Sequence, residues 1–185
     1  MTLVVGMVVG SVLLAGCRSD ADPEPKVSPT ESSSVTPTPT PTGPVEPTLP
    51  AEAEGDDAAA AEAFVRFYWD LVNYAQATGD VGALREVASE TCEACLAGLK
   101  GIEEVHSAGG SIEGGDVSVS SARAEQVTSR EGRAFTVQVS TEVSPQQISE
   151  PNEEPRRFAG GPVQFQFIVR NQDGIWSVMR LDVDQ

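Results

Sequence analysis

Prolines are crowded into one segment of the sequence, and this confines the fold to the rest of the chain. Nine of the thirteen prolines lie between Asp22 and Ala51, including "TPTPTPTGP" at 36–44, with almost no bulky apolar residue among them. Such a stretch cannot form a core, and its prolines favour extended polyproline-II backbone. We therefore expect residues 17–50 to form a disordered stalk and residues 51–185 to form one globular domain.

The N-terminus has the pattern of an export signal. Residues 2–14 are predominantly apolar, a run that is shorter than the about 20 residues of a membrane-spanning helix and typical of a signal peptide. It ends in Leu-Ala-Gly-Cys at 14–17, which resembles the bacterial lipobox, although no Lys or Arg precedes the run. The resemblance implies removal of residues 1–16, a diacylglycerol on Cys17, and anchoring to the outer face of the cytoplasmic membrane.

The charge of the chain limits its partners. The formal net charge is -16 at pH 7 and the sequence pI is about 4.3. A strongly anionic protein is repelled by nucleic acid and by anionic lipid headgroups. We therefore expect no nucleic-acid binding, and membrane contact only through the lipid on Cys17.

Residues 51–110 have the spacing and capping residues of helices. Asp56 and Asp57 precede an alanine-rich amphipathic stretch that stops at Gly79. Asp80 and Thr91 are placed to cap two further helices, and Gly109 and Gly110 end this half. The apolar residues expected to face the core recur at helical spacing: Phe64, Tyr68, Leu71 and Ala75, then Val81, Leu84 and Val87, then Leu96, Leu99, Ile102 and Val105.

After residue 110 the apolar period changes to two, which predicts half-buried antiparallel strands. Val117 and Val119 alternate with serines, and three further segments follow: "AFTVQVSTEV" at 134–143, "VQFQFIV" at 163–169 and "IWSVMRLDV" at 175–183. Turns are expected at Glu131-Gly132 and Asp173-Gly174. Residues 145–161, with three prolines, are predicted to be a longer exposed loop.

Helices followed by strands predict an α+β domain, with three N-terminal helices packed on a curved four-stranded antiparallel sheet. This arrangement resembles the cone-shaped fold shared by nuclear transport factor and ketosteroid isomerase. The segment "AFVRFYWDLVNYAQATGDVGALREVASETCEACLAGL" at 63–99 is similar to a family of uncharacterised actinobacterial lipoproteins, in which a lipobox, a Thr/Pro stalk and a CxxC helix recur. That family brings no established activity.

Cys92 and Cys95 raise the question of redox chemistry. With Cys17 assigned to the lipid, these two form a pair that is expected to be oxidised outside the cytoplasm. The first turn of a helix favours a reactive thiolate, whereas the neighbouring glutamates and the absence of a preceding strand oppose it. We favour a local disulfide that stabilises the helix, with a thiol-disulfide oxidoreductase and a metal site as alternatives. Zinc needs four ligands, and His106 is the only histidine.

The rest of the sequence contains no nucleophile motif, phosphate loop or metal-ligand cluster, so no cofactor, metal or catalytic residue is expected. His106, the only imidazole, follows two glutamates at a helix end, where a capping role is expected. The cone resemblance implies a pocket between the first helix and the concave sheet. Candidate residues there are Tyr68, Trp69, Tyr74, Phe165, Trp176 and Arg180.

The sequence therefore predicts an exported, lipid-anchored protein whose acidic domain binds an envelope protein or a small ligand without catalysis. Two enzymatic alternatives remain open. One is an extracytoplasmic thiol-disulfide oxidoreductase that uses Cys92 and Cys95. The other is a cone-fold enzyme without metal, with a site at Tyr68 or Asp70.

Overall fold

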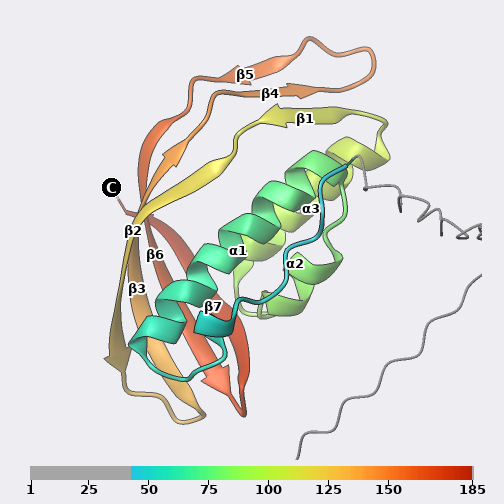
Figure 1. Cartoon of the computed structure of the whole chain (residues 1–185). Coiled ribbons are helices and arrows are strands. Elements are labelled where there is room, and N and C mark those ends of the chain that lie inside the picture. Colours follow the sequence, from blue (N-terminus) through green and yellow to red (C-terminus); the bar gives the residue numbers. More distant parts are fainter. Residues whose placement is uncertain (1–42, 185) are drawn as a thin grey trace, which may run out of the picture. The chain divides into compact units, whose positions relative to one another are not determined.

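The computed structural model describes residues 43–184 (Figure 1). The predicted signal peptide, the predicted lipidation site Cys17 and the predicted stalk up to residue 42 lie outside the described residues. Three α-helices and one short 3-10 helix come first: η1 Ala51–Ala53, α1 Ala58–Thr78, α2 Gly82–Val87 and α3 Glu93–Ser107. The three predicted helices are thus confirmed.

The first and longest helix, α1, begins and ends where the sequence predicts. Asp57 Oδ1 accepts a hydrogen bond from the Ala60 N–H at 2.9 Å. At the other end, Gly79 adopts a left-handed backbone with φ 79°, and its N–H donates to the Ala75 carbonyl at 2.8 Å. Glycine suits this position because it carries no Cβ. The four residues predicted to face the core are all buried: Phe64, Tyr68, Leu71 and Ala75.

Neither of the two shorter helices has the predicted residue at its N-cap position, and for α2 this position is Val81. Near the start of α2, the Asp80 carboxylate accepts a backbone N–H at 3.0 Å. The N-cap residue of α3 is Cys92 rather than Thr91, and its Sγ accepts the Cys95 N–H at 3.3 Å. The Thr91 hydroxyl instead donates to the Met179 carbonyl at 3.3 Å. The Thr91 side chain, which the sequence pattern predicted to cap α3, therefore makes a tertiary contact instead.

A four-stranded antiparallel sheet has the strand order β2-β3-β6-β7. Its strands are β2 Val117–Val127, β3 Arg133–Val143, β6 Gly161–Gln172 and β7 Ile175–Asp184. Alternate β3 side chains are buried, and Val137 lies opposite Phe167 in the β3–β6 register. Asp173 and Gly174, with φ of 56° and 86°, form the predicted two-residue turn between β6 and β7. The α+β class is confirmed.

A second sheet, with the order β1-β4-β5, was not predicted. It consists of β1 Ser111–Gly114, β4 Gln146–Ser149 and β5 Arg156–Phe158. The prediction of a loop over residues 145–161 was therefore wrong. Its prolines fall before β4, in the turn after it and before β5, so none interrupts the hydrogen bonds of the ladder. The prolines lie at the ends of these strands, and their number led to the prediction of a loop where short strands are present.

The two sheets are connected through strands that bend sharply, since β1 leads into β2, β3 into β4 and β5 into β6 (Figure 1). Four glycines with positive φ lie at these bends, among them Gly114 with φ 69° and Gly160 with φ 72°. A Cβ on Gly114 would collide with the Pro145 carbonyl, and one on Gly160 would collide with the Val143 carbonyl. The bends therefore require residues without a side chain.

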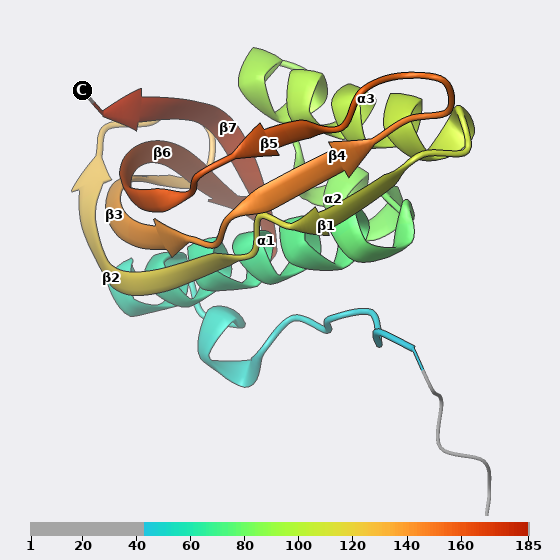
Figure 2. The same cartoon turned by 90° about the horizontal axis from the view of Figure 1, so that it is seen from above.

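Helix α1 lies along the free edge of β2, and the core is formed between the helices and the four-stranded sheet (Figure 2). The Asn73 side chain donates to the Val117 carbonyl at 3.0 Å and accepts the Val117 N–H at 2.8 Å, as a neighbouring strand would. At the opposite edge, the Ser89 N–H donates to the Val178 carbonyl at 2.9 Å. These contacts satisfy part of the backbone hydrogen-bonding groups on the edge strands β2 and β7. Between residues 43 and 184, no helix is long and apolar enough to cross a membrane.

Candidate functional site

The six residues predicted to line a pocket do not share one cavity. Tyr68 and Trp69 are core residues, and Trp69 packs on Phe165 with a ring-centroid distance of 4.7 Å. Trp176 lies elsewhere in the core, stacked on Phe64 at 5.4 Å. Side chains from the helix and the sheet thus fill the space where the cone resemblance placed a ligand.

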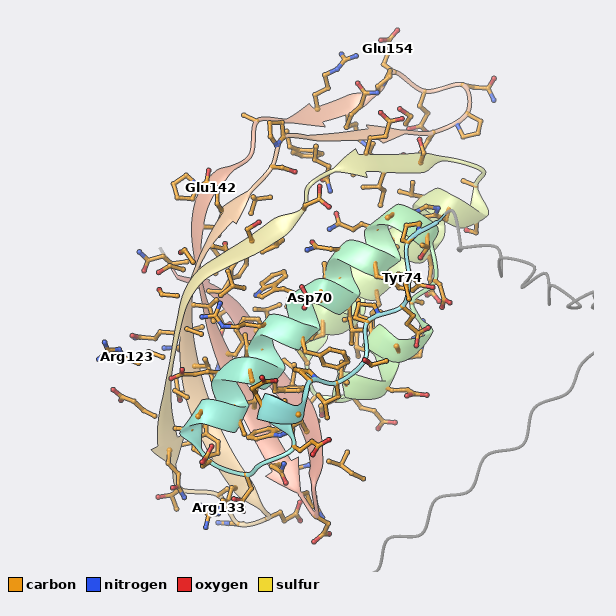
Figure 3. All side chains as sticks on the ribbon, viewed as in Figure 1. Asp70, Tyr74, Arg123, Arg133, Glu142 and Glu154 are labelled. Atoms are coloured by element: carbon orange, nitrogen blue, oxygen red, sulfur yellow. A yellow bond between two sulfur atoms is a disulfide. The ribbon has the colours of Figure 1, made fainter. Side chains whose placement is uncertain are left out.

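The other two predicted residues lie apart from these aromatic clusters. Arg180 is exposed on β7, where its Nε donates to Asp182 at 2.6 Å. Tyr74 and Asp70 lie on α1 beside residues 44–47 (Figure 3). Partial burial there raises the pKa of Asp70 above the usual carboxyl value.

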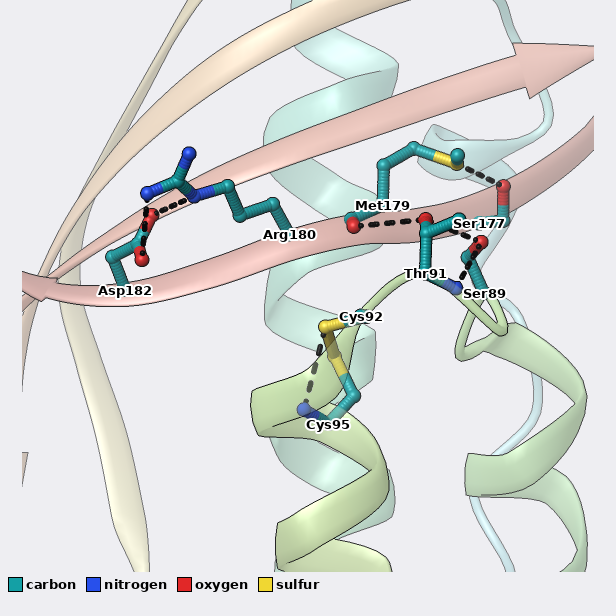
Figure 4. Close-up of a disulfide and its surroundings, with 8 residues drawn as sticks. All are labelled: Ser89, Thr91, Cys92, Cys95, Ser177, Met179, Arg180 and Asp182. Atoms are coloured by element: carbon teal, nitrogen blue, oxygen red, sulfur yellow. Dashed lines mark hydrogen bonds and ion pairs between the residues drawn. A yellow bond between two sulfur atoms is a disulfide. The ribbon is translucent and has the colours of Figure 1, made fainter.

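Cys92 and Cys95 form the predicted disulfide at the start of α3, with an S–S distance of 2.04 Å (Figure 4). The two cysteines are only 1% and 2% exposed. The loop before them is held to β7 by the hydrogen bonds of Ser89 and Thr91 described above. Since thiol-disulfide exchange needs an accessible sulfur, this burial favours a structural bond.

His106 joins α3 to α1. Its ring is half-buried, and Nε2 lies 3.0 Å from the Gln76 carbonyl. The ring also lies against Gly79, where a Cβ would be within 3 Å of it. Within the described residues, no cluster of three or more His, Cys, Asp or Glu could hold a metal ion. The position of His106 is therefore that of a packing residue.

A hollow of about 300 Å³ lies between α3 and the second sheet. Its polar side chains bond to one another, since Gln146 donates to Gln76 at 2.5 Å and Arg156 to Glu150 at 2.7 Å. Pairs that satisfy each other leave fewer groups to orient a ligand. We therefore regard this hollow as a weaker candidate than the cleft described next.

The strongest candidate is an apolar cleft of about 450 Å³ between the N-terminal segment, α1, α2 and the β6–β7 turn. Its volume lies within the range of about 300–1,000 Å³ that is typical of ligand sites. Twelve residues line the cleft: Glu46, Pro47, Thr48, Leu49, Phe64, Phe67, Ala83, Glu86, Val87, Gly174, Ile175 and Trp176. Two rim residues leave apolar surface in water, since Leu49 is 41% and Ile175 is 72% exposed.

One wall of the cleft is formed by residues 44–50, which we call the strap. The strap runs beside α1 and leads into η1 (Figures 1 and 2). Pro47 and Pro50 are half-buried, while the residues between them are exposed. The strap belongs to the segment that composition assigned to the stalk. Prolines at 44, 47 and 50, together with Val45 and Leu49, were the available signal that it differs from the Thr-Pro repeat.

The floor of the cleft is formed over aromatic side chains, one of which is held in place by hydrogen bonds. Phe64 and Phe67 come from α1, and Trp176 comes from β7. The indole N–H of Trp176 donates to the Ala53 carbonyl at 2.8 Å and lies 3.2 Å from the Gly55 carbonyl. These bonds fix the orientation of the indole ring, and Trp176 is only 4% exposed beneath the cleft.

The charged residues that line the cleft are both acidic, Glu46 and Glu86. No nucleophile paired with a base lines it, so the described residues supply the cleft with shape, apolar contact and negative charge. These properties fit binding of an apolar or cationic ligand.

Comparisons with known proteins give a family but no activity. The fold is similar to a solved structure described as the intermembrane space region of chloroplast protein ARC6, with a TM-score of 0.47 and 13% identity over 69% of this chain and 95% of that chain. No curated protein matches the sequence. Residues 37–182 match the Family of unknown function (DUF6318), and the chain therefore belongs to this family.

Proposed function

We propose that this protein is an actinobacterial cell-envelope lipoprotein. Its signal peptide is removed, Cys17 carries a diacylglycerol, and the lipid holds the protein at the outer face of the cytoplasmic membrane. The Thr/Pro stalk then carries a domain of the nuclear transport factor and ketosteroid isomerase type, which binds a partner and catalyses no reaction. The Leu-Ala-Gly-Cys sequence at 14–17 and the proline-rich segment after it support the anchoring.

The apolar cleft is the observation that carries the binding function. Its floor lies over Phe64, Phe67 and Trp176, which are at most 7% exposed, and its accessible apolar surface comes from Leu49 and Ile175 on the rim. Exposed apolar side chains around a concave site are a common feature of ligand and partner binding. The cleft is also adjacent to the strap, so a bound partner would sit where the domain joins the stalk.

The two enzymatic alternatives have less support. Exchange chemistry at Cys92 and Cys95 requires exposure of sulfurs that are almost completely buried. Tyr68 is 3% exposed, and burial raises the pKa of its hydroxyl. Asp70 is two residues away on α1, and residues two apart on a helix do not face each other. A shared acid-base site at these two residues is therefore disfavoured.

The anchoring is tested by Cys17→Ala in the full chain, expressed in a bacterium that makes lipoproteins. Wild-type protein should incorporate labelled fatty acid and sediment with membranes, whereas Cys17→Ala should lose both properties. Ser19→Ala is the matched control and should behave as wild type. An unlabelled wild-type protein would contradict the anchoring.

The binding site is tested in intact cells with a photo-crosslinking amino acid at position 175. Position 183 on the same strand is the control, because Val183 is similarly exposed, at 59%, and does not line the cleft. We expect a discrete adduct from position 175 and none from position 183. Absence of an adduct at 175, or equal adducts at both positions, would contradict binding in the cleft.

A further inference from the structure

We propose that the occupant of the apolar cleft is the β5 edge of a second copy of this chain. This inference rests on the proposed binding function and names the partner. It follows from two described surfaces that are complementary in apolar character and in charge. One is the cleft, and the other consists of Arg156, Arg157 and Phe158 on β5, which we call the basic edge.

The basic edge is exposed and takes no part in the core. Within the described residues β5 pairs only with β4, so its other side is a free edge of the second sheet (Figure 2). All three of its residues are exposed, and Phe158 is 51% exposed. Aromatic residues and arginine are enriched at protein interfaces relative to the rest of the surface. The composition of the basic edge is therefore that of a contact surface.

Phe158 differs from the other exposed apolar side chains in the charge beside it. Only Phe158 directly adjoins basic residues in the sequence, whereas Val45 and Val183 adjoin acidic ones. Six large apolar side chains of the described residues are exposed: Val45, Leu49, Val127, Phe158, Ile175 and Val183. The basic edge is thus the one described surface segment that joins an exposed large apolar side chain directly to positive charge.

One of the two arginines of the basic edge keeps its charge available to a partner. Arg156 forms an ion pair with Glu150 at 2.7 Å. Arg157 Nε instead donates to the neutral Gln147 side chain at 2.9 Å, and no carboxylate among residues 43–184 forms an ion pair with it. Charged side chains on an edge strand oppose its pairing with another strand. We therefore expect the basic edge to bind through its side chains and not by extending a sheet.

The cleft has the opposite charge and an apolar rim. Leu49 and Ile175 are 41% and 72% exposed there. Glu46 and Glu86 line the cleft, and no Lys, Arg or His among the described residues does so. The volume of about 450 Å³ is ample for one aromatic side chain above the buried floor. The basic edge of a second copy would cover both rim side chains and bring Arg157 to the two carboxylates.

The two surfaces lie at opposite ends of the domain. Figure 1 shows β5 at one end and the β6–β7 turn, which borders the cleft, at the other. The contact therefore joins unlike surfaces of two copies, and each further copy leaves one cleft and one edge free, so that rows form. The net charge of -16 opposes association at long range, but physiological salt screens this repulsion beyond about 8 Å.

The test is sedimentation velocity of the purified full chain at physiological salt. The sedimentation coefficient of the wild type should rise with protein concentration. Ile175→Asp alters the cleft and Phe158→Asp alters the basic edge, and each should weaken association at least tenfold. Both side chains are exposed, so neither change should unfold the domain. Val183→Asp is the matched control, since Val183 is 59% exposed and belongs to neither surface, and it should associate as wild type.

Mixing the two variants tests whether the contact joins unlike surfaces. Ile175→Asp keeps an intact edge and Phe158→Asp keeps an intact cleft, so an equimolar mixture should form dimers and nothing larger. A charge exchange tests the electrostatic part of the contact. Glu86→Arg and Arg157→Glu should each weaken association, and the chain that carries both changes should regain part of it.

A wild-type chain that stays monomeric, a variant mixture that stays monomeric, or association that Ile175→Asp leaves unchanged would overturn the proposal. These failures differ from failure of the proposed function. An adduct in cells between position 175 and a different protein, in a chain that does not self-associate, would keep the cleft as a binding site and exclude a second copy as its occupant. No adduct at all would remove the site.

Discussion

Reduction of the Cys92–Cys95 disulfide should lower stability by an amount set by its small loop. The bond joins residues three apart in sequence, and closing a four-residue loop contributes about 2 kcal/mol in the chain-entropy model. With a slope of about 2 kcal/mol per molar urea, the unfolding midpoint should fall by about 1 M. The melting temperature should fall by about 4–8 °C for a domain of this size. Folding itself should survive, since two reduced thiols are small apolar groups in the core.

The assay is urea unfolding of the full chain with and without a phosphine reductant, followed by tryptophan fluorescence. Because both sulfurs are buried, we also expect reagents that attack the Cys92–Cys95 disulfide to react only when the domain opens. The reaction rate should therefore rise with the urea concentration. The double variant Cys92→Ala/Cys95→Ala is the control. It should have a lowered midpoint in both conditions and no response to the reductant.

The result that would refute this reasoning is a readily reduced bond whose loss costs no stability. A reduction potential of about -120 to -230 mV, with the same urea midpoint in both states, is the behaviour of catalytic dithiols. It would show that the native domain exposes the sulfurs, and it would revive the oxidoreductase alternative. A potential below about -300 mV, with the expected fall in midpoint, would confirm a structural bond.

Three further predictions test how the domain is held together. Asn73→Ala removes both side-chain hydrogen bonds to Val117 and should lower the free energy of unfolding by about 2 kcal/mol in urea titrations; an unchanged value would mean that water replaces the amide. Burial raises the pKa of Asp70, so the cost of its charge is present above that pKa and absent below the unfolded value of about 3.9. Asp70→Asn should therefore raise the melting temperature at pH 7 and less so at pH 4, whereas Glu125→Gln, at an exposed site, should show no such difference. Trp176→Phe keeps the apolar ring but removes the donor to the backbone near η1, and should cost about 1 kcal/mol in the same titrations; no loss would show that this bond does not fix the strap end.

The sequence alone determined the elements whose signals are local. An aspartate before an alanine run and a glycine at its end set both ends of α1, because the capping hydrogen bonds join residues three or four apart. A strict period of two identified β3 and β6, since one face of each strand is buried. The Asp173-Gly174 turn followed from its backbone preference for positive φ. The pairing of Cys92 with Cys95 followed from the number and spacing of the cysteines.

The tertiary structure decided everything that depends on contacts between distant residues. The strands β4 and β5 are short and flanked by prolines, and only pairing with β1 makes them a sheet. Thr91 bonds to Met179, 88 residues away, instead of capping α3. The Asn73 side chain bonds to the backbone of Val117, 44 residues away, because α1 lies along the edge of β2. Such hydrogen bonds leave no periodic pattern in the sequence, because the partners have no fixed spacing.

The candidate site also depends on contacts between residues that are distant in sequence. The sequence predicted that aromatic residues now seen on α1, β6 and β7 would line a pocket. It could not show which of them pack in the core, since that depends on which ring packs against which strand. The strap has a composition like that of the predicted stalk, but it lies against the domain, where Pro47 lines the cleft together with residues of α1, α2 and β7. Local composition sets how extended a segment is, whereas the surface it meets decides whether it becomes part of a binding site.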